Sequence, residues 1–372
     1  MTLSFMTFNV RHDHHEESNM TPFAEPPAKE APFDTAQFQY EQPWSIRKWK
    51  IVDTILLYSP DVVGLQEPVH HQVLDIEALL HDQYEWIGAG REDGDKKGEF
   101  SAVFYKKDVL TVEDWKTFWL SETPDIAGSQ SWDARHPRTA TQVTFKKANS
   151  DDRFTVFNTH MDHVGANARE QSSKLILERA RPASDEYGPV FLLGDLNSTE
   201  DDPAYLTLTN SKYRESKGKN DTLANLQELN QVCASAYSGR TGEPVRTAEN
   251  NMTLPTHRVI RPGQLLANLK KQQQEQKYTE YYFEDASYEL VTRIDSKGDT
   301  TTLSGPFGFR DTLTSFGVGN DSDRAPLRID FIMPLQSNTF KIKVIQFAVL
   351  PNQYDDGLYI SDHRPVLARI SW

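Results

Sequence analysis

Short runs of apolar residues recur along the chain and predict β-strands. Residues 190–193 (Val-Phe-Leu-Leu) stand between Pro189 and Gly194, a pattern typical of a strand that is buried on both faces. Residues 3–10 alternate apolar and small polar side chains, which predicts a strand that ends near Asn9. The same criteria predict further strands at residues 62–66, 84–88, 101–105, 109–118, 139–145, 154–160, 328–333, 341–350 and 365–372.

Three stretches are predicted to be helical. Residues 44–58 carry a stripe of apolar side chains that begins at Trp49 and ends before Pro60. The other two helices are predicted at residues 69–80 and 166–179. An order of strand, helix, strand and then many strands indicates an α/β protein with mixed sheets and helices outside.

Two polar stretches interrupt this pattern. Residues 11–41, rich in Pro, Glu, His and Ala, predict a long surface loop. His12, His14 and His15 suggest a metal site there, although histidines in such loops are usually solvated. Residues 236–303 include a run of Lys, Gln and Glu and predict an insertion that decorates the core. No internal repeat is present. Because layered sheet folds can reach this length as one unit, we expect residues 1–372 to form one domain.

Composition narrows the class of protein. Hydrophobic residues at 37% and charged residues at 25% are ordinary for a soluble globular protein. Cys233 is the single cysteine, which excludes a disulfide framework or a cysteine-based metal site within one chain. The first residues do not have the pattern of a signal peptide, and no run approaches the ~18 apolar residues of a membrane helix. A cytoplasmic, reducing location is the simplest expectation.

The net charge of −14 argues against a protein that coats long nucleic acid through a basic face. It does not exclude a nuclease, because divalent cations bound by carboxylates reverse the local sign of the charge. Nucleic acid therefore stays a possible but disfavoured partner. The sequence does not indicate an oligomeric state.

Polar side chains stand at the ends of, or inside, several apolar strands. Asp195 and Asn197 are two residues apart, and on extended chain they would point into one pocket. Each position also has a plain structural interpretation, such as a turn acid for Glu67 before Pro68. Their number and spread over the chain, with no basic run to pair them, favour a common site. The set is Asn9, Glu67, His160 with Asp162, Asp195 with Asn197, Asp330, and Asp362 with His363.

Metal-assisted hydrolysis of a phosphate ester is the chemistry that would use this set. Mg²⁺ prefers oxygen ligands, and Glu67 is the first candidate. Asp195 suits the orientation or deprotonation of the attacking water, and the Asn197 amide can donate to the developing phosphorane oxygens. His160 and His363 can add charge-assisted hydrogen bonds to the phosphate.

These residues lie in segments that resemble the ordered motifs of the endonuclease/exonuclease/phosphatase superfamily. The resemblance runs from Asn9 to His363, nearly the whole chain. Each segment alone is a weak signal, but the set in this order is highly specific. The segments are Thr7-Phe8-Asn9-Val10-Arg11, Gly64-Leu65-Gln66-Glu67, Asn158-Thr159-His160, Gly194-Asp195-Leu196-Asn197, Arg328-Ile329-Asp330-Phe331 and Ser361-Asp362-His363-Arg364-Pro365.

The resemblance implies a four-layer αββα sandwich, in which two packed mixed sheets are flanked by helices and the site lies at one rim. It implies that Glu67 binds Mg²⁺ or Mn²⁺, helped by Asn9 and by Asp362 at a second position. It also implies that Asp330 orients His363, with Arg328 or the backbone as the alternative partner of Asp330. The implied catalytic residues are His160, Asp195, Asn197, Asp330 and His363.

Four further segments resemble the extra motifs of one branch of the superfamily, the metal-dependent hydrolases whose first motif reads Asn-x-Arg. They are Trp44-Ser45-Ile46-Arg47, Gly90-Arg91-Glu92-Asp93-Gly94, Gly98-Glu99-Phe100-Ser101 and Phe118-Trp119-Leu120-Ser121. In this branch Arg11 stands where DNA-cleaving members commonly have an acid. The loop at residues 305–309 could supply an aromatic wall for a base or sugar, or a hydrophobic plug under the insertion. The residues that either contact substrate or brace loops are Arg11, Arg47, Arg91, Glu99, Asp162, Phe307 and Phe309.

Three functions are compared on this basis. The first is a Mg²⁺-dependent phosphoesterase that acts on a small or terminal phosphate, because the chain is acidic and lacks a basic stripe. The second is a nuclease of the deadenylase or DNase type, since the fold does not determine the substrate. The third is a non-catalytic binding module, against which the complete set of polar residues argues.

Overall fold

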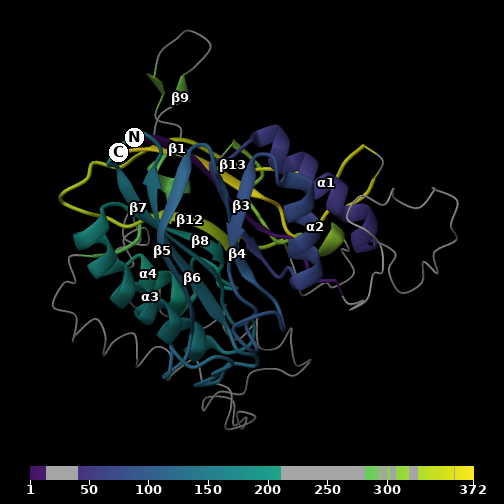
Figure 1. Cartoon of the computed structure of the whole chain (residues 1–372), viewed down its shortest axis with the longest axis horizontal. Coiled ribbons are helices and arrows are strands. Elements are labelled where there is room, and N and C mark those ends of the chain that lie inside the picture. Colours follow the sequence, from purple (N-terminus) through teal and green to yellow (C-terminus); the bar gives the residue numbers. More distant parts are fainter. Residues whose placement is uncertain are drawn as a thin grey trace, which may run out of the picture.

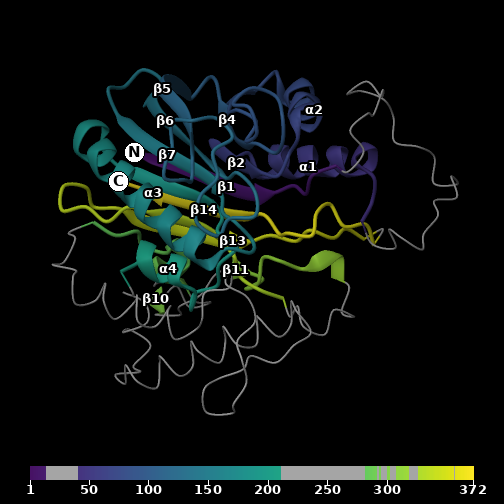
Figure 2. The ribbon, with the colours of Figure 1, turned by 90° about the horizontal axis from the view of Figure 1, so that it is seen from below.

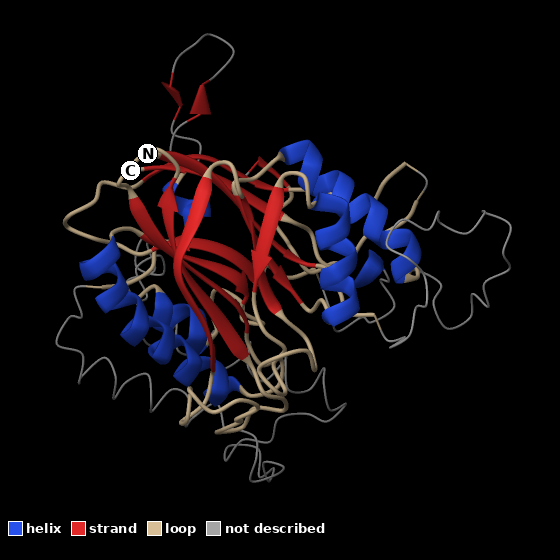
Figure 3. Ribbon diagram, in the orientation of Figure 1, coloured by secondary structure: helices blue, strands red, loops and turns tan. Residues whose placement is uncertain are grey.

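Two mixed β-sheets pack face to face, with helices on their outer sides (Figures 1 and 3). The computed structural model describes residues 1–13, 41–210, 281–290, 293–294, 300–301, 307–317, 326–355 and 357–372. The first sheet has the order β11 (Phe307–Gly308), β13 (Lys343–Val349), β14 (Val366–Ser371), β1 (Thr2–Asn9), β2 (Val62–Gln66), β4 (Ser101–Lys106) and β3 (Tyr84–Ile87). The second has the order β12 (Asp330–Pro334), β8 (Val190–Asp195), β7 (Arg153–His160), β6 (Thr139–Lys147) and β5 (Leu110–Trp119).

The helices form the two outer layers. α1 (Trp44–Tyr58) and α2 (His70–Leu80) cover the first sheet, while α3 (Ala166–Tyr187) and α4 (Pro203–Leu208) cover the second. The short helix α8 (Ala286–Glu289) contacts β12 and β13, one strand of each sheet, and its Ala286 belongs to the inter-sheet layer. Figure 2 shows these layers from below, with the two chain termini side by side. Smaller elements are the strand pair β9 (Arg293–Ile294) and β10 (Thr300–Thr301), and the 3₁₀ helix η2 (Ser315–Gly317).

Three apolar layers separate the four layers of backbone. The inter-sheet layer includes Phe5, Phe154 and Phe191, all fully buried. A second layer joins β1, β2 and β4 to α1 and α2, and a third joins β7, β8 and β12 to α3 and α4. Central strands therefore bury both faces, as the continuous apolar run at residues 190–193 predicts. The predicted four-layer sandwich is confirmed.

Three helices differ from the prediction. α3 does not end at residue 179 but continues through Pro182 to Tyr187, because Ala180 and Ala183 pack into the apolar layer against the second sheet. The short helices α4 and α8 were not predicted. α4 begins at the N-cap Asp202, whose side chain accepts from the Ala204 amide, and all six of its residues are buried.

The predicted insertion at 236–303 lies mostly outside the described residues, as do residues 14–40 of the predicted surface loop with His14 and His15. Within the insertion, residues 281–290 belong to the core. Phe283 is fully buried and pairs with Leu335 beyond the end of β12. Among the helices that the structure describes, none is long and apolar enough to cross a membrane. The cytoplasmic location stays a prediction.

A buried amide bridge joins the two sheets beneath the rim. Gln66 of β2 donates to Asn158 Oδ1 of β7 at 2.6 Å, and Asn158 donates to the carbonyl groups of Leu65 at 2.9 Å and Ala102 at 2.8 Å. Gly64 makes this approach possible, because a Cβ atom there would lie 2.6 Å from Asn158 Oδ1. The bridge therefore sets the register of one sheet against the other.

We expect Gly64→Ala to reduce the free energy of unfolding by about 1–3 kcal/mol, since the added methyl group overpacks a closed interface. Asn158→Ala also destabilises, because it leaves the two carbonyl groups and Gln66 without their partner. In the Asn158→Ala background the methyl group has room, so Gly64→Ala should cost less there. A double-mutant cycle by urea denaturation measures this coupling. Additive effects would contradict the steric explanation.

Candidate active site

The ends of four strands bring the predicted residues together at one rim. β1 and β2 run parallel, as do β7 and β8, and the carboxyl ends of parallel strands meet at the same edge of a sheet. In the first sheet, Asn9 is the last residue of β1 and Glu67 directly follows β2. In the second sheet, His160 and Asp195 are the last residues of β7 and β8 and lie opposite each other in the register of these strands. Each sheet thus contributes part of one buried cluster.

Asn9 connects the two sheets within this cluster. Its side-chain nitrogen donates to Glu67 Oε1 at 2.9 Å and to Asp195 Oδ2 at 3.0 Å. Its oxygen accepts from the Arg11 amide at 3.0 Å. Because the nitrogen faces the two carboxylates, Asn9 acts in this geometry as a donor that holds them together, and its role as a metal ligand stays a prediction.

Glu67 occupies a strained position. Its φ of 68° lies in the left-handed region, which is uncommon for residues other than glycine and typical of functional sites. Glu67 Oε2 accepts from the His12 amide at 3.1 Å and lies 2.9 Å from His12 Nδ1. Burial raises the pKa of Glu67, but the bond to His12 and the charges of His160 and Arg11 outweigh it, so the pKa lies well below its ordinary value.

Asp195 is almost fully buried and shares the rim with a second acid. Its Oδ1 accepts from the Asn197 amide at 2.8 Å, and Asn197 has a φ of 46°. Asp330 is the residue directly opposite Asp195 in the antiparallel pair of β12 and β8. Burial, then the charge of Asp330, raise the pKa of Asp195, against the opposing charges of His363 and His160.

His363 and Asp330 form a buried pair. His363 Nδ1 lies 2.8 Å from Asp330 Oδ2, and its Nε2 lies 3.8 Å from Asp195 Oδ2. Burial lowers the pKa of His363, but Asp330 and Asp195 outweigh it and raise the pKa well above its ordinary value. The partner of Asp330 is thus His363, while Arg328 binds Asp285 instead.

The prediction from sequence missed Arg138, which contacts His160. Arg138 Nη1 lies 2.8 Å from His160 Nδ1 and 3.4 Å from Glu99 Oε2, and Glu99 lies 3.5 Å from the same histidine nitrogen. On the other side, His160 Nε2 lies 3.0 Å from the Asn197 side-chain nitrogen. Arg138 directly precedes β6, which runs antiparallel to β7, so the start of β6 lies beside His160 at the end of β7. Arg138 can therefore be recognised as a site residue once the order of the strands is known.

Two arginines that were predicted from the sequence, Arg91 and Arg11, border the cluster. Arg91 is hydrogen-bonded to Glu99. Arg11, with a φ of 60°, lies 3.4 Å from Glu41 Oε1 and 3.8 Å from Glu67 Oε2. Both guanidinium groups are mostly buried beside carboxylates. Glu99 therefore joins Arg91 and Arg138 to His160.

Several predicted residues lie apart from the cluster. Arg47 is buried and donates to the carbonyl groups of residues 10, 11, 42 and 360, which is the bracing role left open for it. Asp162 instead borders the cluster, since its Oδ2 lies 3.7 Å from Arg138 Nε, and it also holds a turn by accepting from the amides of residues 135, 164 and 165. Phe309 is 42% exposed, with the Arg364 guanidinium 3.8 Å from its ring centre. The side chain of Phe307 lies outside the described residues.

The donor set fits a hard divalent cation. Ligand atoms of Glu67, His160 and Asp195 all lie within 4.8 Å of one another, and so do those of Asp195, Asp330 and His363. Two ionisable carboxylates in the first group provide the oxygen ligands that Mg²⁺ and Mn²⁺ prefer. Asp362 is half-buried and belongs to neither group; its carbonyl oxygen accepts from Thr314.

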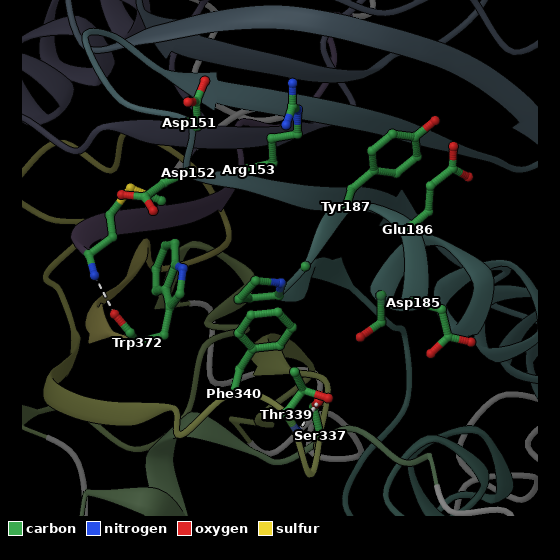
Figure 4. Close-up of a pocket in the computed structure, with 14 residues that line it drawn as sticks. Asp151, Asp152, Arg153, Asp185, Glu186, Tyr187, Ser337, Thr339, Phe340 and Trp372 are labelled. Carbon is green, nitrogen blue, oxygen red and sulfur yellow. Dashed lines mark hydrogen bonds between the residues drawn. The ribbon is translucent and has the colours of Figure 1, made fainter.

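A cavity of about 550 Å³ lies at the opposite end of the strands (Figure 4). It is formed where β7 and β8 begin, by residues that include Asp152, Arg153, Phe340 and Trp372. None of the predicted site residues lines it. The candidate active site is therefore identified by its convergent polar groups and not by the size of a cavity.

Known proteins are similar to this chain in fold or in sequence. The endonuclease/exonuclease/phosphatase of Bacteroides vulgatus is 26% identical, with a TM-score of 0.64 over 100% of this chain and 99% of that chain. A mannosyl-6-phosphatase of Bacteroides thetaiotaomicron is 23% identical, with a TM-score of 0.63 over 100% of both chains, which shows the fold alone. Nocturnin of Drosophila melanogaster is 28% identical over 177 residues, 44% of this chain but only 26% of Nocturnin.

Residues 6–363 match the Endonuclease/Exonuclease/phosphatase family. The match covers the span over which the motifs resemble that superfamily, and the resemblance is confirmed. The chain therefore belongs to the Endonuclease/Exonuclease/phosphatase family, whose members hydrolyse phosphoesters.

Proposed function

We propose that the protein is a Mg²⁺- or Mn²⁺-dependent phosphoesterase that acts on a small or terminal phosphate. The observation that carries the proposal is the convergence of Glu67, Asp195, His160 and the Asp330–His363 pair at one rim. The net charge of −14 supports a small substrate rather than a long polyanion.

Asp195 is suited to accept the proton of the attacking water. Its raised pKa brings the carboxyl group closer to neutral pH, where proton transfer is most efficient. Bonds from Asn9 and from the Asn197 amide fix both carboxylate oxygens. Glu67 would hold the divalent cation, which when bound would supply positive charge to the phosphate oxygens.

The two histidines are suited to stabilise negative charge on the phosphoryl group. Asp330 binds Nδ1 of His363, so that Nε2 faces the Asp195 side of the site and can donate. The N–H groups of Arg138 and Asn197 face the two ring nitrogens of His160, so His160 would donate to a phosphate only after one of these contacts is released. His363 Nε2 and the Arg138 guanidinium place donors near the position that a phosphate would occupy between the two sheets.

The nuclease alternative rests on the similarity of part of the chain to Nocturnin. The acidic chain argues against tight binding of long nucleic acid, because phosphate contacts from Lys and Arg dominate such affinity. Hydrolysis of oligonucleotides with a steep loss of affinity as salt increases would favour this alternative. Turnover of phosphomonoesters alone would remove it.

We expect Asp195→Asn to lower kcat by about 10²- to 10⁴-fold with little change in KM, because the variant cannot accept the proton. The measurement is a panel of an aryl phosphomonoester, an aryl phosphodiester, sugar phosphates and short oligonucleotides with Mg²⁺ or Mn²⁺. Asp152→Asn, at the cavity on the opposite end, is the control and should retain full activity. A wild-type protein that leaves the whole panel intact would refute the proposed function.

Glu67→Gln should weaken Mn²⁺ binding by at least about tenfold, since it removes a charged oxygen ligand. Isothermal titration calorimetry of wild type and variant tests this directly. A chelator should abolish activity of the wild type, and added Mg²⁺ or Mn²⁺ should restore it. Equal Mn²⁺ affinity in the two proteins would exclude Glu67 as a ligand.

The pH dependence of kcat/KM should report the Asp330–His363 pair. Asp330 raises the pKa of His363, so His363 stays protonated above its ordinary range and loses its proton only as the pH rises further. Asp330→Asn removes this charge and lowers the pKa of His363. The fall of kcat/KM on the alkaline side should therefore begin at lower pH in the variant, measured at saturating metal. An unchanged alkaline limb would be evidence against protonated His363.

A further inference from the structure

A buried arginine anchors the segment that leads to Asp330. Arg328 lies two residues before Asp330, and its side chain is 6% exposed. Its two terminal nitrogens donate to the two oxygens of Asp285 at 2.7 and 2.6 Å. One of them also donates to Glu200 Oε1 at 3.0 Å. Such two-pronged contacts fix orientation as well as distance.

The two acids are themselves held in place. Asp285 is fully buried, accepts from the Tyr205 hydroxyl at 2.7 Å and caps α8 through the Ser287 amide at 3.0 Å. Glu200 accepts from the Tyr288 hydroxyl at 2.5 Å. Arg328 therefore binds two carboxylates that cannot easily move with it, and the cluster acts as a rigid support.

This cluster connects two segments of the candidate active site. Glu200 lies three residues after Asn197, in the turn that follows β8, while Arg328 leads into β12, which begins at Asp330. The backbone joins the same two segments where the Leu196 amide donates to the Ile329 carbonyl at 2.9 Å. A change at Arg328 would consequently alter the position of Asn197 relative to Asp330.

Stability alone does not explain these buried charges. Apolar side chains of similar volume often stabilise a core as well as, or better than, a buried ion pair, because burying charges costs desolvation energy. Phe331 already packs against Arg328, with the guanidinium carbon 4.6 Å from its ring centre. The apolar layer around the arginine would accommodate such a replacement.

We propose that Arg328 is a positioning residue of the hydrolytic site. By binding Asp285 and Glu200 at once, it sets the distance between Asn197 and Asp330, and through Asp330 it orients His363. The inference rests on the proposed function, since it assigns these residues to the hydrolysis of a phosphate ester. Arg328 itself contacts neither substrate nor metal in this role.

The test replaces the ion pair as a unit. Arg328→Met/Asp285→Leu removes both members of the two-pronged pair together, so neither is left as an uncompensated buried charge, and Glu200 keeps its bond to the Tyr288 hydroxyl. We expect kcat to fall about ten- to a hundredfold with a nearly unchanged KM, because small displacements of catalytic groups have large effects on rate. Arg328→Lys keeps the charge but not the two-pronged contact and should give a smaller loss. It also serves as the test if the double variant does not fold.

The matched control is Lys48→Met/Asp75→Leu. This buried pair, at 3.2 Å, joins α1 to α2 in the outer layer and does not connect the strands of the site. We expect its kcat to equal that of the wild type, even if thermal stability falls as much as in the Arg328 variant. If the two double variants lose the same stability but only the Arg328 variant loses kcat, the loss of activity reflects the position of the site residues and not a general loss of folding.

A second readout does not depend on turnover. The Nδ1 proton of His363, bonded to Asp330, gives an NMR signal that should persist in the Lys48 control and shift or vanish in the Arg328 variant. A variant with wild-type kcat would overturn the positioning role and leave the proposed hydrolysis intact. If the wild type hydrolyses nothing, the proposed function fails, and an unchanged His363 signal would then overturn the positioning role as well.

Discussion

The amide bridge between Gln66 and Asn158 is the contact on which the arrangement of the site depends. Apolar layers hold the two sheets together, but many packings of similar volume satisfy an apolar interface. A buried amide that must find its partners permits only one register. Because Gln66 precedes Glu67 and Asn158 lies two residues before His160, that register also brings Glu67 Oε1 to 3.9 Å from His160 Nε2.

The charges at the rim follow from this close approach. Asp195 and Asp330 are cross-strand neighbours, and like charges in that position repel one another. His363 lies against both, and Asn9 donates to Asp195 and Glu67, so that the acids are compensated without leaving the interior. A cation would add to the same compensation. The strain at Glu67 and Asn197 is consistent with a site whose geometry the surrounding fold imposes.

Apart from β11, which was expected to be part of a loop, the sequence predicted the described strands of both sheets and the polar groups at their ends, because alternation and apolar runs are local signals. It did not predict that α3 continues through Pro182, since packing of Ala183 outweighs the local effect of proline. Arg138 was missed because its importance depends on the neighbouring strand. For Arg47 the sequence left open substrate contact or bracing, and only the contacts with four carbonyl groups distinguish them.

By itself, the sequence determined the family, the four-layer class and the residue types available for phosphoester hydrolysis, because these are encoded in short motifs and in periodicity. The tertiary structure decided how those residues meet. It directed the nitrogen of Asn9 towards two carboxylates, paired Asp330 with His363, and paired the buried Arg328 with Asp285. These outcomes depend on contacts between segments far apart in the chain, which no local pattern records.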